Sequence, residues 1–127
     1  MKQLVWVCLG GALGSGARYL VSIWSLARYG PAFPYGTLAV NVLGSCLLAV
    51  LWALSRTTTW LSPTVQLALG AGMMGGFTTY STFNLELFRF VENGQTRTAA
   101  LYGVVTLGGC LAAGFVGMYL VRLALGK

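Results

Sequence analysis

The sequence predicts an all-α membrane protein, a single domain over residues 1–127 with four transmembrane helices per subunit. Hydrophobic residues make up 57% of the chain and charged residues only 8%, far from the composition of a soluble domain. Four apolar runs follow one another with short connectors, and each approaches or exceeds the roughly 20 residues that span a bilayer. We therefore expect no separate soluble domain within these 127 residues.

The first apolar run covers about Leu4 to Ala27 and the second about Gly36 to Leu54. Between them lies a turn rich in proline and in aromatic residues typical of membrane interfaces. The start of the chain superficially resembles a signal peptide, but Arg18 interrupts the region where cleavage is expected. We therefore expect the first run to be a retained membrane helix.

The third run covers about Pro63 to Phe90 and contains a break that we expect near Gly75–Tyr80. Gly75 and Gly76 loosen a helix, and the hydroxyl and β-branched residues after them are poor helix formers. Apolar sequence flanks the break, so it lies at membrane depth, where irregular backbone is tolerated only inside protein or beside a wet cavity. Interrupted membrane helices of this kind often hold an ion.

The fourth run covers about Thr98 to Leu125, and four spans place both termini on one side of the membrane. Flanking cations are nearly balanced between the two sides, so the positive-inside rule gives no clear orientation. This balance indicates either a weak signal or insertion in both directions. The cations are Lys2, Arg56, Arg122 and Lys127 on the terminal side, and Arg28, Arg89 and Arg97 on the other.

Small residues recur at four-residue spacing, which allows close contact between membrane helices. The pairs are Gly10 with Gly14, Gly72 with Gly76, and Ala113 with Gly117. Contacts within one chain explain some of them. Because so small a bundle has few buried surfaces on which to build a site, we also expect a homo-oligomer.

Several polar side chains lie at membrane depth, and two interpretations stay open for each. Asn41 needs a partner or water, and it either serves function or makes an interhelical hydrogen bond. Arg18 either attracts an anion, or caps carbonyl groups or snorkels to the interface. Glu86 is the only acidic residue in the apolar runs, and its i,i+3 spacing to Arg89 favours a local ion pair.

Other function classes find little support in the composition. The formal charge of +6 comes from scattered Lys and Arg, so nucleic acid is not an expected partner. Cys8, Cys46 and Cys110 show no paired spacing and the chain has no His, so we expect buried structural cysteines without a zinc site. No nucleophile, base and orienting group occur together, so we do not expect an enzyme.

Three motifs, in this order and covering nearly the whole chain, resemble the Fluc (CrcB-like) fluoride channel family. They run over Gly10–Tyr19, Gly36–Asn41 and Gly75–Phe83, and the third is the most specific. The resemblance implies an antiparallel, dual-topology homodimer in the bacterial inner membrane, with two pores that export fluoride passively. It also implies a structural sodium ion held by backbone carbonyls of Gly75 and Thr78.

The resemblance further implies which side chains line the fluoride pathway. The family's pore asparagine falls on Asn41, and its paired pore phenylalanines fall on Tyr80 and Phe83, so Tyr80 departs from the family pattern. A polar track falls on Tyr102, Thr106 and Cys110, where Cys110 replaces the usual hydroxyl. Hydroxyls of Thr79, Ser81 and Thr82 accompany the pathway, and Arg18 and Glu86 are vestibule or structural residues.

Two other interpretations compete with a fluoride channel. A small multidrug-type, proton-coupled exporter is also a four-helix antiparallel dimer, but it needs a carboxylate at its centre, and the first run has none. A membrane scaffold without transport predicts no ion flux.

Overall fold

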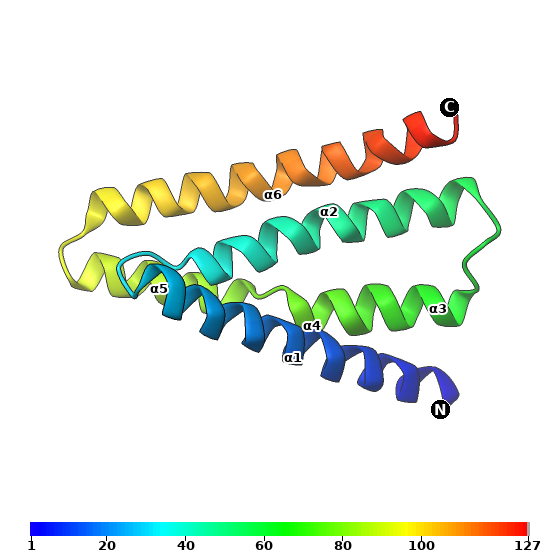
Figure 1. Ribbon diagram of the computed structural model, residues 1–127, viewed down its shortest axis with the longest axis horizontal. Helices are drawn as coiled ribbons and strands as arrows, with labels where there is room; N and C mark the ends of the chain where they lie inside the picture. The colour runs from blue at the N-terminus through cyan, green and yellow to red at the C-terminus, as the bar shows by residue number, and fades with distance from the viewer. Residues whose placement is uncertain (127) are drawn as a thin grey trace.

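The computed structural model describes residues 1–126, which form helices and connectors without strands (Figure 1). The three long helices are α1 (Lys2–Tyr29), α2 (Tyr35–Thr57) and α6 (Thr96–Ala124), each long and apolar enough to cross a membrane. The third segment is divided into α3 (Pro63–Leu67), the π-helix η1 (Ala68–Met74), α4 (Gly75–Phe77) and α5 (Tyr80–Glu92). The expected all-α fold with a broken third helix is confirmed.

Residues with special backbone preferences mark the ends of the helices. Gly30, with φ of 75°, ends α1, and Gly94, with φ of 72°, turns the chain from α5 into α6. Ser62 begins α3 by accepting a hydrogen bond from the Val65 N–H at 3.3 Å, and Pro63 follows it. Successive segments run antiparallel, so both ends of the chain lie at the same end of the bundle (Figure 1).

Glycines bring α1 into backbone contact with η1 and α4. A Cβ atom at Gly76 would lie 2.5 Å from the Gly11 carbonyl oxygen, and one at Gly72 would lie 2.7 Å from that of Val7. Gly10 and Gly14 are buried against the backbone of Ala68 and Met73. These small-residue pairs therefore serve packing within the chain, as does Gly117 of α6 against Cys46 of α2.

The break lies inside the expected region, but Gly75 and Gly76 do not cause it. Both glycines are helical, and the Thr78 N–H still bonds the Met74 carbonyl at 3.0 Å. The chain becomes extended at Thr78 (φ −83°, ψ 159°) and at Thr79 (φ −154°, ψ 112°). Gly76 instead allows the close approach of α1, which the expectation of a loosened helix did not include.

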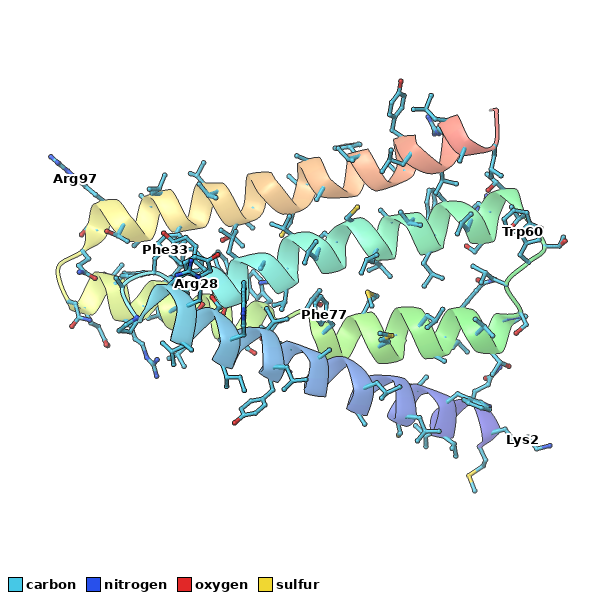
Figure 2. All side chains as sticks on the ribbon, viewed as in Figure 1. Lys2, Arg28, Phe33, Trp60, Phe77 and Arg97 are labelled. Atoms are coloured by element: carbon cyan, nitrogen blue, oxygen red, sulfur yellow. The ribbon has the colours of Figure 1, made fainter. Side chains whose placement is uncertain are left out.

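The interior of the bundle is narrow, and most large apolar side chains face outward (Figure 2). Val40 of α2 and Tyr102 of α6 are fully buried, and these two helices pack against each other. The expectation of buried cysteines is wrong for Cys8, which is exposed on α1, whereas Cys46 and Cys110 are half-buried. The outward apolar surface fits a protein surrounded by lipid. Lys127 lies outside the described residues.

Candidate functional site: a polar path beside the broken helix

Asn41 of α2 holds the peptide group at the break. Its Oδ1 accepts a hydrogen bond from the Thr79 N–H at 2.7 Å, and its Nδ2 donates to the Thr79 carbonyl at 3.0 Å. Gly44, one turn further along α2, leaves room for Thr78, whose methyl would overlap a Cβ atom there. The interhelical hydrogen bond expected as one interpretation of Asn41 is thus present, and one Nδ2 N–H remains for another acceptor.

Thr79 also begins α5 with its side chain. Its Oγ1 accepts from the Thr82 N–H at 3.2 Å and donates to the Thr82 hydroxyl at 3.0 Å, and it lies 3.4 Å from Ser81 Oγ. This is N-cap geometry at membrane depth, where the N-terminus of a helix carries partial positive charge. The three hydroxyls predicted beside the break are therefore brought together.

Arg18 of α1 donates from Nε to the Gly76 carbonyl at 2.9 Å. The structure therefore favours the carbonyl-capping interpretation of this cation. Its own carbonyl accepts from Ser22 Oγ at 2.9 Å, which belongs to the same helix. This charged hydrogen bond from a half-buried arginine adds to the glycine packing that joins α1 to α4.

Tyr80 and Phe83 lie one turn apart on α5, with ring centroids 5.8 Å apart. Phe83 is only 3% exposed and meets the Tyr102 ring edge-on at 5.1 Å. Tyr80 is 68% exposed and faces away from the body of the chain. The two predicted pathway rings are therefore adjacent, but a single chain encloses only one of them.

Glu86 faces α2 and α6, and its hydrogen-bond partners are two hydroxyl groups rather than Arg89. Its two carboxylate oxygens accept hydrogen bonds from the Thr37 hydroxyl at 2.8 Å and from the Tyr102 hydroxyl at 2.7 Å. Arg89, one turn further along α5, acts on the Glu86 carboxylate through its charge. Thr37 was not predicted, because a single sequence does not tell which hydroxyl lies opposite the lone carboxylate.

The predicted polar track on α6 runs along the face that meets α2. Tyr102 is fully buried, Thr106 is 3% exposed and Cys110 is half-buried. The Thr106 oxygen is buried and meets no strict hydrogen-bond geometry within residues 1–126, and the Tyr102 hydroxyl on the same face is its polar neighbour. A buried hydroxyl that is so weakly bonded is costly, so this position can offer a donor on the track.

A cavity of about 670 Å³ opens at the end of the bundle that carries the α1–α2 loop. Thr82 and Glu86 line it and Arg18 does not, so of the two residues predicted to be vestibule or structural, Glu86 lies at the cavity and Arg18 at the break. Several of its polar lining residues were not predicted, because they have no motif of their own and are united only by the fold. They are Ser22, Ser25, Thr37, Arg89, Asn93 and Gln95.

Among the described residues, no cluster of three or more His, Cys, Asp or Glu is placed to hold a metal. Of the two residues whose carbonyls were predicted to hold sodium, Gly75 begins α4 just before the break and Thr78 lies within it.

Fold and site together define a small multi-pass membrane protein with a broken third segment and a buried line of hydroxyl and amide groups. The chain belongs to the CrcB-like protein family (Camphor Resistance, CrcB), whose characteristic sequence matches residues 5–118. This match confirms the resemblance drawn from the three motifs.

Bacterial relatives match over nearly their whole length. A protein of Anaeromyxobacter dehalogenans is 55% identical over 122 residues, which cover 96% of this chain and 97% of the relative. Proteins of Sorangium cellulosum and Rhizobium meliloti are 48% and 43% identical, each over 96% of this chain and over 96% and 98% of their own lengths. All three are named "Fluoride-specific ion channel FluC".

Proposed function

We propose that this protein is a fluoride-selective ion channel through which fluoride leaves the cell passively, without an enzymatic step. The observation that carries the proposal is the buried polar face of α6, on which the Thr106 hydroxyl, without a strict hydrogen bond in residues 1–126, lies with Tyr102 and Cys110. Fluoride is small and strongly hydrated, so a selective path must replace its water with hydrogen-bond donors. Uncharged donors do this while still allowing release.

The pathway runs from the cavity at the α1–α2 end along α6 and past the break. Thr82 contributes to the cavity, and Thr106 and Cys110 continue the track. Asn41 offers its remaining amide N–H beside the break. The donors along this route are thus hydroxyl, thiol and amide groups without formal charge.

Aromatic rings and two further hydroxyls border the same route. The Phe83 ring edge carries partial positive charge and can face an anion, and Tyr80 extends the aromatic surface outward. The hydroxyls of Thr79 and Ser81 lie at the start of α5, next to the break. These groups add weak electropositive contacts to the uncharged donors of the track.

A second copy of the chain completes the pathway in this proposal. Tyr80 is 68% exposed and Gly75 is also exposed, although both belong to the functional segment. Lys2 lies at one end of the bundle and Arg28 and Arg97 at the other, so neither end is marked clearly as cytoplasmic (Figure 2). These observations support an antiparallel homodimer with two pores.

The carbonyl groups at the break fit a sodium ion shared by the two copies. The backbone N–H groups that helical geometry would give to the Gly75 and Thr78 carbonyls donate instead to Asn41 and to the Thr79 side chain. Both carbonyls are therefore free of these donors, and hard cations take oxygen ligands of this kind. When bound, the ion supplies positive charge that lowers the cost of an anion nearby.

Ion efflux from liposomes tests the function. Purified protein in vesicles loaded with fluoride should release it without a proton gradient, as read with a fluoride electrode, while chloride stays inside. Proton-driven uptake of a lipophilic cation would instead support the exporter. Both Glu86 oxygens are engaged by neutral hydroxyls, which gives the exporter no free central carboxylate.

A further inference from the structure

Two side chains determine which carbonyl groups at the break keep their helical donors. In an unbroken helix the Thr79 N–H would bond the Gly75 carbonyl, and the Thr82 N–H would bond the Thr78 carbonyl. Here the Thr79 N–H donates to Asn41 Oδ1 at 2.7 Å, and the Thr82 N–H donates to Thr79 Oγ1 at 3.2 Å.

The carbonyl group of Gly76, which lies between these two positions, has a side-chain donor. Its carbonyl accepts from Arg18 Nε at 2.9 Å, so a protein cation already occupies it. The carbonyl groups of Gly75 and Thr78 therefore differ from that of Gly76. Side chains take away the backbone N–H groups that would bond them, and no side-chain donor bonds them at the break.

We propose that Asn41 is a positioning residue for the bound cation, because it keeps the Gly75 carbonyl available by holding the Thr79 peptide. This inference rests on the sodium site of the proposed function. The second bond, from Nδ2 to the Thr79 carbonyl at 3.0 Å, fixes the orientation of Thr79. Two bonds from one amide resist a return of the Thr79 N–H toward Gly75.

The competing state is a repaired helix. A backbone N–H at membrane depth must find an acceptor. Without Asn41, the Gly75 carbonyl is the acceptor that helical geometry provides for Thr79. That bond then competes with the cation for the same oxygen. Asn41 thus links the cation to the anion pathway, since its remaining N–H is free to face fluoride.

Thermal unfolding of the purified full-length protein tests this link, with NaCl titrated against choline chloride at constant ionic strength. In Asn41→Ser the serine side chain is too short to reach the Thr79 peptide. The loss of the hydrogen bond from the Thr79 N–H should raise the Na⁺ concentration for half-maximal stabilisation about tenfold. Asn41→Asp keeps an acceptor for the Thr79 N–H but loses the donor to the Thr79 carbonyl, so its Na⁺ concentration for half-maximal stabilisation should lie between those of the parent and of Asn41→Ser.

Thr106→Val is the matched control on the anion pathway. It should lose fluoride flux and keep the Na⁺ response of the parent, because Thr106 does not contact the break in any hydrogen bond. A folded Asn41→Ser variant with the parent's Na⁺ response would overturn the inference. If Asn41→Ser does not fold, Asn41→Asp decides, and loss of its Na⁺ response would also overturn the inference.

The parent protein separates the two proposals. Fluoride flux without stabilisation by Na⁺ would overturn the positioning role of Asn41 and leave the channel function standing. Stabilisation by Na⁺ without fluoride flux would overturn the channel function, while the Asn41 variants would still test the positioning role.

Discussion

Phe83 and Tyr80 share one face of α5, yet their surroundings differ. Phe83 is enclosed by its own chain and packs edge-on against Tyr102, whereas the Tyr80 ring is largely exposed. Helical spacing predicted their proximity correctly. It gave no means of deciding which ring would be covered, because burial depends on α6, which follows in the chain.

Phe83→Ile should reduce fluoride flux strongly while the protein still folds. The substitution removes the ring edge but retains apolar bulk, so the expected loss of stability is below about 1.5 kcal/mol. Efflux from liposomes and thermal unfolding measure the two effects separately. A folded variant that conducts at the parent rate would assign the ring to packing alone.

Tyr80→Phe should leave fluoride flux intact or raise it. The exposed phenol makes no hydrogen bond within residues 1–126, so its removal leaves no partner unsatisfied in the single chain. The same efflux measurement checks this variant beside the parent. Loss of flux would mean that the hydroxyl itself is required at this position.

At the scale of elements, the glycines of the third segment show where sequence patterns mislead. Paired glycines followed by hydroxyl and β-branched residues predicted a break near Gly75–Tyr80. The extended residues Thr78 and Thr79 lie within that range. The cause was different, since Gly75 and Gly76 are helical and Gly76 lies against the backbone of α1. Helix propensity is local, whereas the use of a glycine for close approach depends on the partner helix.

Gly76→Ala should destabilise the protein by about 1–3 kcal/mol, because its methyl group would press against the Gly11 backbone. Gly16→Ala is the matched control on α1, since nothing lies within 4 Å of the added methyl. The control should be neutral or slightly stabilising, as alanine favours helix. Thermal unfolding compares the two. Equal unfolding temperatures would show that α1 can move away from α4 at little cost.

At the scale of the whole molecule, four apolar runs predicted the bundle and the common side of the two termini. The cavity at the α1–α2 end was not predicted, because its lining comes from separate parts of the chain. The hydrogen bond of Thr37 to Glu86 was likewise not predicted, because it depends on how α2, α5 and α6 pack together. Contacts between distant segments carry no periodic signal in a single sequence.

Dual topology predicts that the C-terminus is found on both sides of the membrane. Three described cations lie at the end of the bundle that carries the termini: Lys2 begins α1, and Arg56 and Arg122 lie in the last turns of α2 and α6. Three lie at the other end, in the last turns of α1 and α5 and the first turn of α6: Arg28, Arg89 and Arg97. With charge so evenly divided, neither orientation is strongly favoured. A protease-cleavable tag at the C-terminus should therefore be accessible from both faces of sealed vesicles. Protection from one face only would contradict the prediction.

The common side of the two termini also limits how two copies can be joined into one polypeptide. A short hydrophilic linker from the end of α6 to the start of a second α1 stays on one side of the membrane and yields two parallel copies (Figure 1). A gene fusion that preserves opposite orientations needs a connector that itself crosses the bilayer, about 20 apolar residues long as a helix. If this gene were duplicated within one reading frame, the connector between the two copies would need an odd number of membrane-spanning segments. Only then could the fused protein form an antiparallel pair.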